Sequence, residues 1–257
     1  MKQIVRIIAT LLVLLVMSTG SLFAAMEEGN ATLGGVNGYI VIPSAQPVSS
    51  GENASVTTGY SAIFALPDGF AHIPFIQFGF GRDFEVGLAV DIAEKADVLL
   101  NTKWRFVEKE TTSVAFGIVG QALEVGDATK FAAQAYIASS FTSTFIDWPS
   151  KTTILIGYTF RKDMNTNIDF GMGFQAPLLE NVFKGKVDFL IDFGNVSYSS
   201  SPSGGEAEDR GLLNIGARLL PVEFMQSTTI AADVRLIDVF DHSGRALSAG
   251  VSISFRP

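Results

Sequence analysis

Charged residues recur at alternate positions along segments whose other positions are apolar. In residues 84–92, Glu85 and Asp91 share one parity with Gly87 and Ala89, and the apolar residues take the other. Since successive side chains of a β-strand point to opposite faces, these charges lie together on one polar face. The charges placed in this way along the chain are Glu85, Asp91, Lys103, Arg105, Asp169, Asp188, Asp192, Arg218, Asp233 and Arg235.

Charges of both signs on an enclosed face serve one of two purposes. In a water-filled channel, opposite signs on facing walls set a field that selects solutes. In a closed structure they form ion pairs, because buried charges must be paired or hydrated. We expect the acidic members of the set to face the basic members across one lumen, and both purposes remain open.

Residues suited to catalysis or metal binding are few. The two histidines, His72 and His242, fall in predicted loops, and Asp238 and Asp241 lie near the second. A solvated turn explains that group, and the sequence shows no nucleophile beside a base. With no Cys, a thiol-based zinc or redox site is excluded. We predict no catalytic residue, no metal site and no cofactor, and therefore no enzyme.

The amino-acid composition narrows the class of protein further. The chain has 257 residues, of which 47% are hydrophobic and 17% charged, whereas about a quarter are charged in an average soluble domain. The net charge of −8 argues against nucleic acid as a partner, because such binding needs a basic surface.

The first 25 residues have the pattern of a secretory signal peptide. Lys2 and Arg6 precede an apolar stretch, 7–17, which is too short for a membrane-spanning helix of about 20 residues. Small residues follow up to Ala25. We therefore expect an exported protein, located in the outer membrane or in the periplasm.

Alternation with a period of two predicts an all-β fold. Several runs reach the length that a tilted strand needs to cross a bilayer. About twelve strands are predicted, within a range of 10–14: 53–65, 73–81, 84–92, 97–107, 113–123, 130–141, 152–161, 167–176, 186–195, 211–221, 228–238 and 245–255.

The small residues on the polar faces favour an antiparallel transmembrane β-barrel. Gly and Ala recur there, which suits a confined lumen better than an open surface, and Phe recurs on the apolar faces, which suits contact with acyl chains. The predicted lipid-facing residues are Phe84, Leu88, Trp104, Phe116, Phe170, Met172, Phe189, Val234 and Phe255. A charge there, as in Leu88→Arg or Met172→Arg, should cost roughly 2–4 kcal/mol, and Gly173→Ser on the inner face much less. A soluble periplasmic β-protein that binds a lipid is the alternative fold assignment.

An even number of strands places both ends of the barrel on the periplasmic side. The longest connection, 198–210, then lies outside the cell. Residues 142–151 would form a rather long periplasmic turn.

The export signal, the alternating strands and Phe255 near the C-terminus together resemble Gram-negative outer-membrane β-barrel proteins of the porin type. The resemblance implies outer-membrane lipid as surroundings and the barrel-assembly machinery as a partner that reads the last strand. A shorter likeness covers 38–60, where Gly38 to Ala45, Gly51 and Gly59-Tyr60 are similar to the opening of YjbH-like outer-membrane proteins. It implies location only.

The predicted organisation is therefore a signal peptide (1–25), an N-terminal segment (26–52) and a barrel (53–257). The segment is expected to fold into the lumen as a plug or to form a periplasmic tail. The predicted function is a passive or gated pore for a small solute of unknown identity. A non-conducting structural or surface-interaction barrel is the alternative, and the oligomeric state is left open.

Overall fold

The computed structural model describes residues 31–49, 53–65, 69–126, 129–145, 148–161, 167–196, 211–242 and 244–256. The predicted signal peptide, the ends of segment 26–52 and the connection 198–210 lie outside these ranges. Among the described residues, no helix is both long and apolar enough to cross a membrane.

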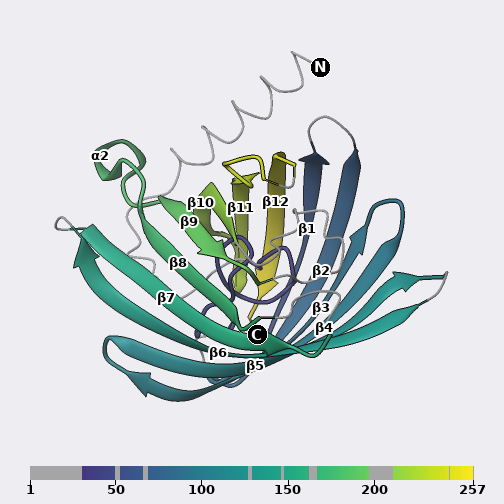
Figure 1. The fold of residues 1–257 in the computed structure, drawn as a ribbon. Coiled ribbons are helices and arrows are strands. Elements are labelled where there is room, and N and C mark those ends of the chain that lie inside the picture. Colours follow the sequence, from purple (N-terminus) through teal and green to yellow (C-terminus); the bar gives the residue numbers. More distant parts are fainter. Residues whose placement is uncertain are drawn as a thin grey trace.

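Twelve antiparallel strands form one closed barrel (Figure 1), which confirms the predicted fold and strand number. Each strand pairs with its neighbours in sequence, and β1 closes the barrel on β12, with Val56 opposite Phe255. The strands are β1 (Ser55–Ala65), β2 (Phe70–Phe80), β3 (Phe84–Ile92), β4 (Ala96–Lys109), β5 (Thr112–Val125), β6 (Lys130–Phe145), β7 (Trp148–Thr159), β8 (Asp169–Pro177), β9 (Val187–Gly194), β10 (Leu212–Met225), β11 (Thr228–Ile237) and β12 (Ala246–Phe255).

The two ends of the barrel differ. One end, here the turn end, holds the start of β1, the end of β12 and the connections that follow even-numbered strands. Several of these are tight, such as residues 110 and 111 between β4 and β5; the connection from β8 to β9 carries a short helix, α2 (Glu180–Phe183). The opposite end, here the loop end, holds the connections that follow odd-numbered strands, including the longest one, from β9 to β10.

Two predictions about strand boundaries were wrong. The expected long turn at 142–151 does not exist, because β6 and β7 continue to Phe145 and Trp148, which pair with each other. His72 is not in a loop, because β2 begins at Phe70. In both places polar or small residues interrupt the apolar alternation, yet the backbone of each strand continues to pair with its neighbour.

Alternation of burial follows the alternation of residue types. In β2, every second residue from Ala71 to Gly79 is buried, and the residues between them are exposed or half-buried. Large apolar side chains are exposed all around the outside, from Phe64 of β1 to Phe255 of β12. The barrel is therefore apolar on its outer surface, as expected where a membrane surrounds it.

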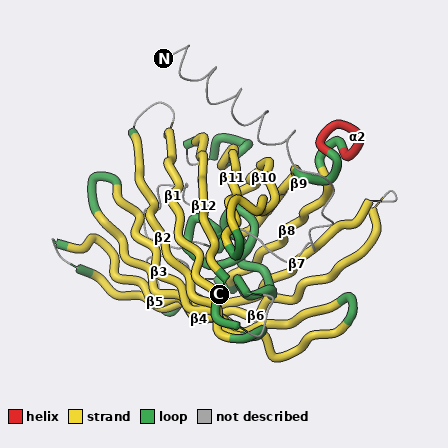
Figure 2. The backbone as a smooth tube through the Cα atoms, turned by 180° about the vertical axis from the view of Figure 1, so that it is seen from behind, coloured by secondary structure: helices red, strands yellow, loops and turns green. Residues whose placement is uncertain are grey.

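Residues 31–49, here the lumen segment, lie inside the barrel. The segment is the purple coil enclosed by the strands in Figure 1 and the green loops at the centre of Figure 2. Within it, only Val41 and Gln46 are more than marginally exposed. The segment folds on itself through isolated bridges, Ala31 to Asn37 and Gly38 to Pro43.

Candidate functional site: the occupied lumen

All ten charged residues predicted to line the lumen are buried, each with a relative exposure of 5% or less. Of the nine residues predicted to face lipid, eight are exposed on the outer surface, with Phe170 the least so at 36%. The ninth, Phe189, is half-buried.

The ion pairs differ from the expected arrangement. Lys103 Nζ lies 3.2 Å from Glu85 Oε2 on the adjacent strand, and Arg218 Nε lies 3.7 Å from Asp233 Oδ2, also on an adjacent strand. Arg235 pairs at 2.6 Å with Asp233 of its own strand. These pairs do not face one another across an open lumen, because the lumen segment occupies the space between the walls.

Asp192 of β9 binds three consecutive backbone amides of the lumen segment. Its Oδ2 accepts hydrogen bonds from the N–H groups of Ile40, Val41 and Ile42 at 2.9, 2.7 and 3.0 Å. Its Oδ1 accepts a fourth, from Asn214 at 2.8 Å. Successive N–H groups that converge in this way form a compact site for an anion. Here the anion is a side chain of the barrel wall.

Arg218 of β10 binds the other side of the same turn. Its Nη1 donates to the carbonyl of Gly38 and its Nη2 to the carbonyl of Tyr39, both at 2.8 Å. Residues 38–42 thus lie between two charged side chains. The Arg218 guanidinium donates hydrogen bonds to their carbonyl oxygens, and the Asp192 carboxylate accepts hydrogen bonds from their N–H groups. The wall supplies the partners that a buried, non-helical backbone would otherwise lack.

Asn37 is held by an ion pair of the wall. Its N–H donates to Glu85 Oε1 at 2.8 Å, and its carbonyl accepts from Lys103 Nζ at 3.0 Å. Glu85 Oε2 also accepts the N–H of Val48 at 2.7 Å, so one carboxylate joins two distant parts of the lumen segment.

Further wall side chains complete the attachment to the carbonyl groups of 31–35. Arg235 Nη2 donates to Ala31 at 3.0 Å, Asn101 Nδ2 to Gly34 at 2.7 Å, and Gln77 Nε2 to Gly35 at 3.3 Å.

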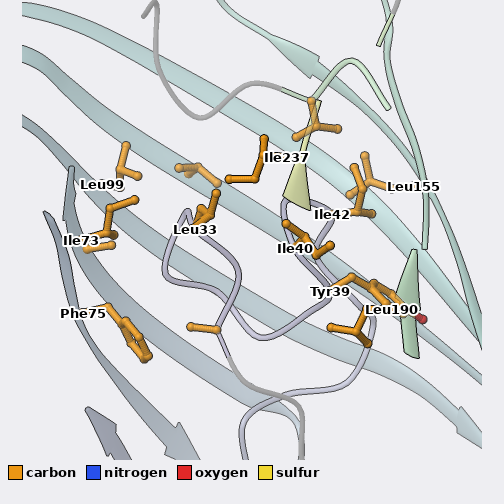
Figure 3. Close-up of a cluster of buried hydrophobic side chains, with 14 of the residues drawn as sticks. Leu33, Tyr39, Ile40, Ile42, Ile73, Phe75, Leu99, Leu155, Leu190 and Ile237 are labelled. Carbon is orange, nitrogen blue, oxygen red and sulfur yellow. The ribbon is translucent and has the colours of Figure 1, made fainter. Parts of the chain in front are cut away.

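Apolar packing fits the segment to the wall. Figure 3 shows Leu33, Tyr39, Ile40 and Ile42 among wall residues that include Leu155 and Leu190. Small wall residues make room for them: a Cβ on Gly171 would lie 2.6 Å from Ile42 Cδ1, and one on Gly173 would overlap the ring of Tyr39. This packing argues against the expectation that Gly173→Ser is mild, because the added side chain and the Tyr39 ring would occupy the same space.

The Tyr39 hydroxyl is part of a polar chain. It hydrogen-bonds to Thr153 Oγ1 at 2.9 Å, and Thr153 to Ser140 Oγ at 2.6 Å. Burial raises the pKa of Tyr39, which keeps the hydroxyl protonated and able to donate. Ser140 Oγ in turn accepts the N–H of Ala45 at 2.9 Å.

The histidine and carboxylate residues considered for catalysis are separate. His72 lies on the outer surface, where its ring nitrogen hydrogen-bonds to the Tyr60 hydroxyl. Asp238 is buried and its N–H donates to Asn214 Oδ1 at 3.0 Å, whereas Asp241 is exposed. No cluster of three or more His, Asp or Glu side chains that could hold a metal ion occurs in the part of the chain that the structure describes.

Several contact residues were missed from sequence. Asn37, Ser140, Thr153, Asn101 and Gln77 carry much of the attachment, and nothing in their local pattern distinguishes them from other polar residues of strands or loops. The one available signal was the run of small inward residues, which indicated a confined space but not its occupant.

An apolar exterior, a charged interior and full closure define a transmembrane β-barrel. No protein-family model and no curated protein sequence matches the chain. Among solved structures it is similar to the KdgM porin, with 9% sequence identity and a TM-score of 0.50 over 76% of this chain and 97% of that one. The NanC porin has 9% sequence identity and a TM-score of 0.49, over 79% of this chain and 100% of that one. Omp33 of Acinetobacter baumannii has 8% sequence identity and a TM-score of 0.44, over 80% of this chain and 100% of that one. The likeness to KdgM shows that the chain has the fold of outer-membrane porins.

Proposed function

We propose that this protein is an outer-membrane channel for small solutes whose resting state is closed by the lumen segment. The observation that carries the proposal is the attachment of the segment to the wall through charged side chains. Asp192, Arg218, Glu85 and Lys103 bind its backbone, and these side chains would line a hydrated passage if the segment moved aside.

The chemistry of the attachment supports a reversible closure. Each hydrogen bond to a charged group contributes about 1.5–3 kcal/mol, and water can replace each one when the segment leaves. Removal of the segment would leave charges of both signs on a wall of small residues, which is the arrangement of a selective pore. The porin fold supports the same reading.

The alternative is a non-conducting barrel in which the segment serves as a permanent core. The burial of residues 31–49 and the apolar contacts of Tyr39 and Ile42 favour it. The two proposals differ in whether the barrel conducts ions once the lumen segment is removed.

Conductance of purified protein in planar bilayers separates them. We expect the full chain to show rare openings and a variant lacking 31–49 to show frequent, discrete steps. In the deletion variant, Arg218→Ala should shift ion selectivity towards cations. Silence from a deletion variant that is folded and heat-modifiable would reject the channel and favour the structural barrel.

A further inference from the structure

A cavity of about 600 Å³ lies at the turn end of the barrel, beside the lumen segment. Its walls come from the end of β4, the β4–β5 turn, the start of β5, β6 and β7, and one of its lining residues, Gln46, belongs to the lumen segment. The cavity is therefore the place where the segment meets the mouth of the barrel.

The lining suits a polar solute without net charge. Glu108, Glu110, Lys109 and Lys151 contribute two charges of each sign, and the remaining lining side chains are hydroxyls and the amide of Gln46. Arg105 pairs with Glu108 at 2.8 Å and with Asp83 at 3.0 Å, so Arg105 and Asp83 together add no net charge beside the cavity. Hydroxyl and amide groups both donate and accept hydrogen bonds, so a solute with several of each is matched, whereas a net anion or cation gains no excess of opposite charge.

Two side chains of this lining also hold the lumen segment. Gln46 Oε1 accepts from Arg105 Nη1 at 2.8 Å, and its Nε2 donates to Ser113 Oγ at 3.0 Å. Ser140 accepts the N–H of Ala45 and continues through Thr153 to the Tyr39 hydroxyl. A solute that takes hydrogen bonds from Gln46 or Ser140 competes directly with the attachment of the segment.

We propose that this cavity is a binding site for a small, net-neutral solute rich in hydrogen-bonding groups, and that its occupation loosens the lumen segment through Gln46 and Ser140. The inference rests on the proposed gated channel and adds the site from which it is opened. Since both Ser55 and Phe255 lie at the turn end, the solute reaches the site from the side that these ends of the barrel occupy.

The absence of Cys makes single-cysteine labelling of the full chain a direct test of binding. Thr142→Cys places a thiol in the exposed part of the cavity. Glycylglycine and xylitol, two net-neutral probes, should slow its modification by a water-soluble maleimide, by about tenfold at ten times the dissociation constant. Protection by only one of the two identifies the solute as zwitterion or polyol. Succinate and putrescine should have little effect. No protection by either neutral probe, or equal protection by the charged ones, would overturn the site.

Coupling is measured with a second thiol, in Val41→Cys, at a half-buried position of the lumen segment. The neutral probe should raise its labelling rate by about two- to tenfold, the effect expected when one hydrogen bond is lost. Gln46→Ala should raise that rate without solute. Ala93→Cys, at an exposed position of the connection between β3 and β4 at the loop end, serves as the control and should not respond. If the neutral probe slowed the labelling of Thr142→Cys but left the labelling rate of Val41→Cys unchanged, the proposed coupling would be overturned.

These outcomes are separate from the test of the channel. A solute that protects the cavity and exposes Val41→Cys in a protein that never conducts would refute the proposed function and leave the binding site intact. A deletion variant that conducts while the cavity binds nothing would do the reverse.

Discussion

The Asp192 carboxylate and the Val41 amide are 2.7 Å apart, although 151 positions separate the two residues in the chain. Asp192 belongs to the barrel wall and Val41 to the segment inside it. Their contact, with those to Ile40 and Ile42, makes Asp192 a principal attachment of the lumen segment.

Asp192→Asn should release the lumen segment while the barrel stays folded. The amide oxygen still accepts, but it lacks the charge that strengthens three hydrogen bonds, so about 1.5–3 kcal/mol is lost and exposure of the segment rises about ten- to a hundredfold. The labelling rate of Val41→Cys in this background measures the effect. Asp169→Asn, in β8, is the control, because the buried Asp169 carboxylate accepts from Gln134 and Thr159 of the wall. Equal responses of the two variants would show that Asp192 has no special role.

Gly173→Ser should displace Tyr39 and loosen the segment around it. A Cβ at Gly173 overlaps the Tyr39 ring, and the ring has to move because the glycine is part of a paired strand. Gly120→Ser is the control, since its Cβ would meet only the Leu100 carbonyl oxygen at 3.8 Å. We expect faster labelling of Val41→Cys in the first variant and no change in the second. A segment that stays protected in Gly173→Ser would contradict the observed packing.

Leu88→Arg and Met172→Arg should destabilise the barrel in a membrane by roughly 2–4 kcal/mol each, if these residues lie near the bilayer midplane. Both side chains are exposed on the outer face, near the middle of β3 and in β8. Urea titrations of folding into vesicles measure the cost. Ser248→Ala is the inward comparison and should cost little, because the Ser248 hydroxyl has no hydrogen-bond partner among the described residues. The reverse order would argue for a soluble barrel.

Glu85→Gln should be more harmful than loss of the whole Glu85–Lys103 pair. The single change leaves the buried Lys103 ammonium without its carboxylate, for which about 3–5 kcal/mol is typical, whereas Glu85→Gln with Lys103→Met removes both charges. The free energy of unfolding of both single variants and of the double variant forms the test. Strictly additive losses would mean that the pair makes no coupled contribution.

Local periodicity determined the barrel and most of its strands. The bounds of β3 match the prediction at both ends, and β9 and β12 match within one residue at each end. Alternation is a property of neighbouring residues, since the period of a strand is two, and it also assigns each side chain to a face. Glu85 and Leu88 could therefore be assigned to opposite faces without knowledge of their partners.

Where the alternation of apolar and polar residues is interrupted, only the pairing between strands decided whether a residue belongs to a strand or to a turn. Residues 142–151 look like a turn in sequence, yet most of them pair across β6 and β7. His72 likewise became part of a strand because its backbone pairs with Ala62 and Ile92.

The content of the lumen was decided by tertiary structure alone. A segment such as 38–42 carries no signal for its position, since its attachment uses backbone N–H and carbonyl groups that every residue possesses. Its partners, Asp192 and Arg218, lie far along the chain and approach it only after the barrel has closed. The sequence by itself determined that charges of both signs line an enclosed space. Whether those charges would face water or a segment of the same chain depended on contacts that no local pattern records.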